Sequence, residues 1–170
     1  MTTCQAIGDE ANHGSTMGAE QRIKDLGLEL PMPPEPAATF ESAVRTGSLL
    51  FVSGHGPMRP DETFIQGRVG DELDLAQAQE AARLVALGML STVRAALGSL
   101  DRVVRVVKVY GMVHAIPGFR DHPEVLNGFS NLLVEVFGDE IGMGARSAAG
   151  MASLPLSIPV EIEAIFEVAD

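Results

Sequence analysis

Two residues near the end of the chain have the types and the setting that small-molecule chemistry requires. Arg146 stands among the small residues 144–150, and a guanidinium binds a planar carboxylate through two parallel hydrogen bonds. Glu161 follows a Leu-Pro turn, and a buried carboxylate near an arginine can orient or activate a water molecule. Together they predict a small anion-binding pocket. The alternatives are a structural ion pair for Arg146 and simple exposure for Glu161.

A second group of candidates lies where an apolar strand stops, at Ser53, Gly54 and His55. Glycine at such a place lets a ligand approach the backbone closely. His55 is either an acid–base group near neutral pH or a loop histidine bonded to backbone. The histidine spacings match no zinc pattern, and both phosphate-binding glycine motifs are missing from the sequence. We therefore expect neither a metal nor a cofactor.

The hydrophobic pattern predicts an α+β scaffold for these candidates. Residues 160–168 alternate between apolar and mainly polar positions, which is typical of a half-buried strand. Asp74 and Gly98 have the residue types that cap the two ends of a helix. The predicted order is β-β-β-α-β-α-β-β, with two helices on one mixed sheet. The expected elements are strands over 40–45, 49–53, 63–69 and 102–114, helices over 19–28, 74–97 and 123–137, and two C-terminal strands.

The strand expected over residues 102–114 is apolar on both faces, which predicts a central strand covered on both sides. Arg102, Arg105 and Lys108 recur in it at steps of three, so we expect them to divide between the two faces. The net charge of the chain is −11, from 12 basic and 23 acidic residues. Since nucleic-acid binding needs clustered cations, this balance argues against a nucleic-acid partner.

Length and composition predict one domain. The 170 residues suffice for a single core. We expect residues 1–16 to be a disordered lead, without the features of a signal peptide, and residues 17–170 to form the domain. No apolar run is long enough to span a bilayer, so no membrane partner is expected. The single cysteine, Cys4, is typical of a reducing cytoplasm.

Four short motifs, in this order, resemble the reactive intermediate deaminase (Rid) family, also called the YjgF or endoribonuclease L-PSP family. They are Phe51-Val52-Ser53-Gly54, Ala145-Arg146-Ser147, Leu154-Pro155 and Val160-Glu161-Ile162-Glu163-Ala164. The resemblance covers nearly the whole expected domain. It implies a chorismate-mutase-like fold and a homotrimer, with binding sites in clefts between subunits.

The resemblance also implies roles for single residues. Arg146 would hold the carboxylate of a 2-imino or enamine acid, and Glu161 would handle water during hydrolysis to a 2-keto acid and ammonia. The cleft would also contain an asparagine of the second helix, either Asn127, which we favour, or Asn131. Phe40 is expected either to stack on a flat substrate or to lie in the core. The expected substrate contacts are Phe40, Ser53, Gly54, His55, Asn127 and Ser147.

The sequence departs from the deaminating members of that family at two places. Phe40 stands where they have a tyrosine, and Ala148 stands where a cysteine is common. The run from His122 to Leu132 resembles a separate branch. The first hypothesis is therefore an imine or enamine deaminase. The alternative is a non-catalytic trimer that binds a small carboxylate metabolite, and ribonuclease activity is the least supported by the charge.

Overall fold

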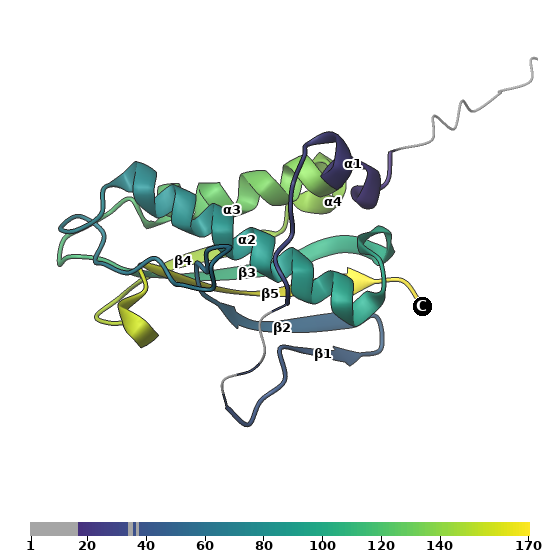
Figure 1. The fold of residues 1–170 in the computed structure, drawn as a ribbon, viewed down its shortest axis with the longest axis horizontal. Helices are drawn as coiled ribbons and strands as arrows, with labels where there is room; N and C mark the ends of the chain where they lie inside the picture. The colour runs from purple at the N-terminus through teal and green to yellow at the C-terminus, as the bar shows by residue number, and fades with distance from the viewer. Residues whose placement is uncertain (1–16, 34–35, 37) are drawn as a thin grey trace, which may run out of the picture.

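The computed structural model describes residues 17–33, 36 and 38–170. The expected disordered lead, residues 1–16, lies outside the described residues. The described chain forms one sheet with its long helices packed on one side (Figure 1). Among the described residues, no helix has the length and hydrophobicity needed to cross a membrane.

Five strands of the described residues form one mixed sheet, whereas the sequence predicts a mixed sheet of six strands. The strands lie in the order β1-β2-β5-β3-β4. Neighbouring strands are antiparallel except β3 and β4, which are parallel. The edge strand β4 therefore follows β3 only after a crossover through a helix. The strands are β1 (Ala43–Thr46), β2 (Leu49–His55), β3 (Val103–His114), β4 (Ala145–Met151) and β5 (Val160–Val168).

Two long helices, α2 (Leu75–Leu97) and α3 (His122–Phe137), lie side by side on one face of the sheet (Figure 1). We call this the helix face and the opposite side the open face. Asp74 caps α2 in a reciprocal capping box with Gln77, and Gly98 ends it at a φ of 82°. Both ends were predicted. The described residues also form two shorter helices, α1 (Ala19–Asp25) and α4 (Asp139–Gly142), and the 3₁₀ turns Leu100–Arg102 and Pro155–Ser157.

The alternation predicted for β5 is confirmed. Every second residue of the strand, from Val160 to Val168, is buried under the helices. The intervening residues, Glu161, Glu163, Ile165 and Glu167, point to the open face. The carboxylates of this strand therefore lie on the side that the helices do not cover.

The predicted strand over residues 63–69 is wrong. This segment makes only isolated bridges, Met58 with Phe64 and Val69 with Leu73 and Ala115. Gly67 has a φ of 125°, outside the range of a strand residue, and its N–H donates to the carbonyl of Ser157 rather than to a neighbouring strand. The segment is therefore an irregular loop tied to the turn before β5.

Strand β3 contains two irregularities that the sequence analysis missed. Its pairing with β5 shifts between Val103 and Arg105 and again between Val106 and Lys108. Each shift adds one residue on β3, so buried valines recur every third residue, at Val103, Val106 and Val109. Arg105 and Lys108 consequently share the open face. The expectation that these two cations divide between the faces is wrong.

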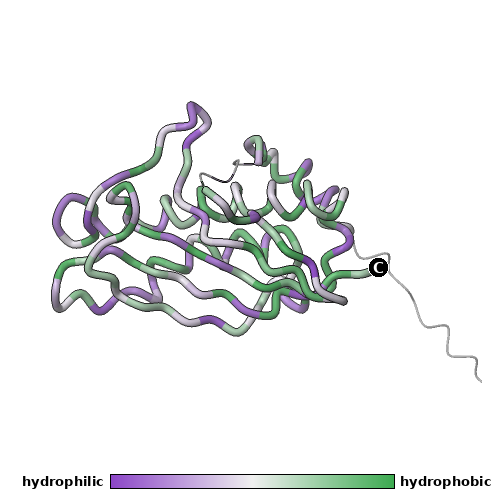
Figure 2. The backbone as a smooth tube through the Cα atoms, turned by 90° about the horizontal axis from the view of Figure 1, so that it is seen from below, coloured by the Kyte–Doolittle hydropathy of each residue, from purple (hydrophilic) through white to green (hydrophobic). Residues whose placement is uncertain are grey.

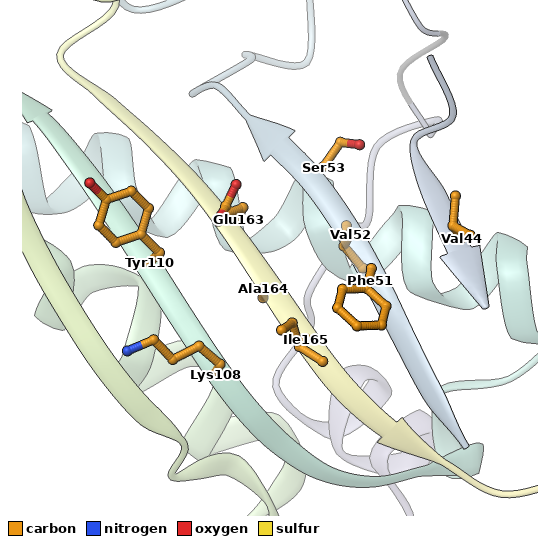
Figure 3. Close-up of a pocket in the computed structure, with 9 residues that line it drawn as sticks. All are labelled: Val44, Phe51, Val52, Ser53, Lys108, Tyr110, Glu163, Ala164 and Ile165. Atoms are coloured by element: carbon orange, nitrogen blue, oxygen red, sulfur yellow. The ribbon is translucent and has the colours of Figure 1, made fainter. Parts of the chain in front are cut away.

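Among the described residues, no helix covers the open face of the sheet (Figure 1), contrary to the prediction that β3 is covered on both sides. Val44, Phe51, Val104 and Val107 are all more than a third exposed. Hydrophobic and hydrophilic residues are interleaved along the strands (Figure 2). A shallow hollow of about 380 Å³ lies on this face, with Lys108, Tyr110, Glu163 and Ser53 around an apolar floor (Figure 3). Such an exposed apolar surface is typical of a subunit interface.

Candidate functional site

Arg146 projects onto the helix face from the edge strand β4. It pairs with Val109 of β3, which is buried beneath the helices, and paired residues point to the same side of a sheet. Its side chain reaches α3, where Nη1 donates to Oδ1 of Asn127 and to Oγ of Ser130, both at 3.0 Å. The guanidinium is thus held at a fixed place by two neutral acceptors.

No carboxylate of the described residues forms an ion pair with Arg146. Ion pairs are instead made by Arg45 with Asp170, Arg83 with Glu135 and Arg94 with Glu20. The alternative hypothesis, that Arg146 forms a structural ion pair, is therefore wrong for the described part of the chain. A partly buried cation without a counter-ion is suited to bind an anion from outside the chain.

Asn127, rather than Asn131, contacts Arg146. The amide nitrogen of Asn127 donates to Oε2 of Glu124 at 2.8 Å, which turns its oxygen toward the guanidinium. Asn131 lies one turn on and is exposed. The helix sits close against α2 here, since a Cβ on Gly128 would lie 1.9 Å from the carbonyl oxygen of Gln79. Of the two asparagines, only Asn127 lies where it could share a ligand with Arg146.

Glu161 lies on the open face, against Gly54. A Cβ on Gly54 would lie 2.1 Å from Oε1 of Glu161, so the glycine leaves room for the carboxylate. The pKa of Glu161 is raised, chiefly by partial burial and further by the neighbouring Glu163. A carboxylate with a raised pKa is a stronger base than an ordinary one. The structure therefore brings together two of the predicted residues, Gly54 and Glu161.

The two predicted serines make internal hydrogen bonds on the open face. Oγ of Ser53 donates to the carbonyl of Glu41 at 2.7 Å. Nζ of Lys108 donates to Oγ of Ser147, also at 2.7 Å. Ser53 lines the hollow of this face together with Lys108 (Figure 3). Both serines thus lie beyond the sheet from the Arg146 guanidinium.

His55 is buried under α2 and makes two internal contacts. Its Nδ1 lies 2.7 Å from the carbonyl oxygen of Ser53, and its Nε2 lies 2.8 Å from the hydroxyl of Thr92. Burial lowers the pKa of His55, against a smaller raising effect of the bond to Ser53. A neutral ring that donates from Nδ1 and accepts at Nε2 satisfies both contacts. This placement favours the structural alternative for His55 over a substrate contact.

Phe40 lies outside the sheet, because β1 begins only at Ala43. It is 50% exposed. The core alternative for this residue is therefore wrong. Stacking on a substrate stays a prediction.

The predicted residues form two half-sites on opposite faces of the sheet. One half-site consists of the predicted residues Arg146 and Asn127 on the helix face, joined there by Ser130, which is not a predicted site residue. The other consists of Glu161 and Gly54 on the open face. Within one chain, the guanidinium and the Glu161 carboxylate therefore do not line a common pocket. No group of three or more His, Cys, Asp or Glu residues in the described ranges is arranged to hold a metal ion.

Three residues of these surroundings were not among the predicted site residues. Ser130 and Glu124 flank Asn127 at three residues on either side, the spacing that places side chains on one helix surface. That spacing is the sequence signal that could have revealed them. Lys108 is a different case, because the two irregularities in β3 decide which face it takes, and these depend on the pairing with β5 rather than on a local sequence pattern.

Comparison with known proteins gives a family for this fold. A family model described as "YjgF/chorismate_mutase-like, putative endoribonuclease" matches residues 20–162. Protein TCP17 of Trypanosoma cruzi is 41% identical over 145 residues, which are 85% of this chain and 91% of that protein. The crystal structure of Atu1372 from Agrobacterium tumefaciens, a protein of unknown function, is 42% identical with a TM-score of 0.79, covering 88% of this chain and 91% of that chain.

A relative with a named activity is more distant. The 2-iminobutanoate/2-iminopropanoate deaminase of Dermatophagoides farinae is 29% identical over 140 residues, covering 81% of this chain and 92% of that protein. The higher identities to TCP17 and Atu1372 place this chain apart from that deaminase, as the departures at Phe40 and Ala148 predict. The family match and the shared α+β fold agree with the four sequence motifs: the chain belongs to the YjgF, or Rid, family.

Proposed function

We propose that this protein hydrolyses a 2-imino acid, or its enamine tautomer, to a 2-oxo acid and ammonia. The observation that carries the proposal is the uncompensated charge of Arg146. In a chain with a net charge of −11, this partly buried guanidinium contacts only neutral acceptors among the described residues. A carboxylate-bearing substrate supplies the missing anion. The named activity of the Dermatophagoides farinae relative supports the same reaction.

The reaction assigns separate roles to the two half-sites. Arg146 holds the substrate carboxylate, and Glu161 accepts a proton from water as the water oxygen bonds to the imine carbon. The substrate reacts as its iminium form, so the C=N bond becomes a single bond to a neutral amino group in a tetrahedral intermediate. Glu161 then returns the proton to this nitrogen, the C–N bond breaks and ammonia leaves, while the hydroxyl group gives its proton to solvent water and a C=O bond forms. Because iminium carbons react readily with water, positioning alone provides useful catalysis.

This mechanism needs two copies of the chain at each site. Arg146 and Glu161 lie on opposite faces of one sheet, so a complete site combines the Arg146 half of one subunit with the Glu161 half of another. The exposed Phe51 and Val44 of the open face provide a surface on which subunits can pack. We propose a homotrimer with three such sites, in line with what the family resemblance implies.

The alternative is a trimer that binds a small carboxylate without turning it over. Phe40 lacks the hydroxyl, and Ala148 lacks the thiol, that deaminating relatives place near the arginine. This alternative retains the role of Arg146 and removes that of Glu161.

A ribonuclease has less support. Arg105 and Lys108 do share the open face, but Glu161, Glu163 and Glu167 occupy the adjacent strand on the same face. Phosphate backbones would meet more negative than positive charge there.

The test is hydrolysis of 2-iminobutanoate generated in situ by an amino-acid oxidase, followed as 2-oxobutanoate and ammonia formation. The wild type should accelerate hydrolysis, and Arg146→Ala should lose at least about 100-fold in kcat/KM, the value of a bidentate charged contact. Arg83→Ala is the matched control, since it removes one positive charge from a surface ion pair. Wild-type protein that binds 2-oxobutanoate but never accelerates hydrolysis would establish the alternative.

A further inference from the structure

The arginine half-site has a fixed arrangement of donors. Both contacts of Arg146 within the chain are made by one nitrogen, Nη1, to Asn127 and to Ser130. This nitrogen carries two hydrogens, so two acceptors use its capacity. In the described part of the chain no acceptor contacts Nε or Nη2. The edge of the guanidinium formed by Nε and Nη2 is therefore free for a bidentate carboxylate.

We propose that Ser130 and Glu124 are positioning residues that hold Arg146 so that its Nε–Nη2 edge receives the substrate carboxylate. The proposal rests on the proposed function and adds two residues to that site. Neither residue touches the substrate. Ser130 acts directly on the guanidinium, and Glu124 acts through Asn127.

Glu124 sets the orientation of the Asn127 amide. An arginine only donates, so Asn127 supports it only when its oxygen, not its nitrogen, faces the guanidinium. The bond from the Asn127 nitrogen to Oε2 of Glu124, at 2.8 Å, stabilises this orientation. A reversed amide would lose both bonds and place two donors against each other. Glu124 thus selects the arrangement in which Nη1 is held.

Ser130 supplies the second acceptor on the same helix surface. A serine inside a helix commonly bonds a backbone carbonyl of the preceding turn. Here the Ser130 oxygen accepts from Nη1 of Arg146 at 3.0 Å. Two acceptors at different places on α3 fix both the position and the rotation of the guanidinium plane, which a single acceptor would leave free.

The start of α3 is itself held in place against α2. Nε2 of Gln79 donates to the backbone carbonyl of Glu124 at 2.9 Å. Gly128 allows this close approach, because any side chain there would strike the α2 backbone. The chain of contacts from α2 through Glu124 and Asn127 to Arg146 therefore begins on a rigid element.

The test uses two pairs of variants that separate hydrogen bonding from shape. Ser130→Ala and Glu124→Ala remove the acceptors, whereas Ser130→Thr and Glu124→Gln retain an oxygen at each place. We expect the alanine variants to raise KM for 2-iminobutanoate about tenfold for Ser130 and severalfold for Glu124, with kcat nearly unchanged, because the lost contact supports substrate and transition state equally. The conservative variants should restore KM. Asn131→Ala, an exposed change on the same helix, is the control.

A second readout needs no turnover. In arginine side-chain NMR spectra, an Nη1 group held by hydrogen bonds rotates slowly. The Arg146 signals should therefore show slow rotation in the wild type and faster rotation in Ser130→Ala. Affinity for 2-oxobutanoate, measured by calorimetry, should fall in parallel. Absence of wild-type hydrolysis would contradict the proposed function alone, and the spectra and calorimetry would still decide the positioning roles. Alanine variants that match the wild type in KM, spectra and affinity, or conservative variants that lose as much as alanine, would overturn the inference.

Discussion

The close approach of Glu161 to Gly54 allows one substitution to separate activity from stability. A Cβ added to Gly54 would lie 2.1 Å from Oε1 of Glu161 and about 3 Å from its Cδ and Cγ. Non-bonded heavy atoms in contact lie about 3.5 Å apart. Gly54→Ala must therefore displace the carboxylate oxygen by more than about 1 Å.

The cost to stability should be small, because the displaced atom is the end of a flexible side chain. The φ of Gly54 lies outside the left-handed region, so alanine fits the backbone. Alanine in place of glycine stabilises by about 0.4–1 kcal/mol through the unfolded state. Forcing Glu161 from its rotamer costs about 0.5–1.5 kcal/mol. The free energy of unfolding should thus change by no more than about 1 kcal/mol.

The cost to activity should be much larger. Misplacing a catalytic group by about 1 Å costs up to about 100-fold in rate. We therefore expect kcat to fall by about 10- to 100-fold, or about 1.4–2.7 kcal/mol of activation free energy. KM should change little, because Arg146 and its partners on α3 are not touched.

The assay combines imine hydrolysis with urea unfolding, and Gly111→Ala is the matched control. A Cβ on Gly111 would lie 2.3 Å from both Cδ atoms of Leu126, which is fully buried in the core and has no room to move. This variant should lose about 1–3 kcal/mol of stability and retain the activity of its folded fraction. Full kcat in Gly54→Ala would refute the role of Glu161. If Gly54→Ala loses as much stability as the control, the Glu161 side chain cannot move aside as argued.

Two further predictions concern Glu161 and the open face. The fold raises the pKa of Glu161. The contribution of Glu161 to the free energy of unfolding is therefore complete below the ordinary glutamate pKa and is lost as the pH rises through the raised pKa. Glu161→Gln should therefore be more stable than the wild type at pH 7 and lose this advantage in acid, as measured by urea unfolding at several pH values. The fall of the wild-type rate at low pH should be absent from the pH profile of this variant. A stability advantage that does not depend on pH would contradict the raised pKa of Glu161. Phe51→Glu places a charge on the exposed apolar surface and should convert the proposed trimer to monomers in sedimentation, with loss of the proposed hydrolysis. A variant that sediments as a stable trimer would show that subunits pack elsewhere.

Much of the scaffold could be predicted because it depends on local chemistry. The ends of α2 follow from Asp74 and Gly98, whose residue types match the caps observed. The faces of β5 follow from its regular alternation. The family motifs predict Arg146 and Glu161 as site residues. The spacing of three residues on α3 places Asn127 on the same helix surface as its neighbours in the site.

The remaining features depend on contacts that local patterns do not encode. The period of three in β3 arises from two added residues whose positions only the pairing with β5 defines. The segment around Gly67 has strand-like composition, but its hydrogen bonds go to the turn at Ser157. The separation of Arg146 and Glu161 onto opposite faces depends on the pairing of β4 with β3, which sets Arg146 beside the buried Val109 and which a single sequence does not give.

The charge of Arg146, which no described carboxylate pairs, also bears on product inhibition in the proposed reaction. Hydrolysis alters the carbon next to the carboxylate and leaves the carboxylate itself unchanged. In the proposed reaction, the contact of Arg146 with the carboxylate is therefore the same for the imino acid and for the oxo acid that replaces it, and we expect this contact to lower KM without raising kcat. A protein built this way captures a scarce, short-lived substrate well. For the same reason, abundant 2-oxo acids should occupy its sites, so that its throughput depends on how fast other enzymes consume them.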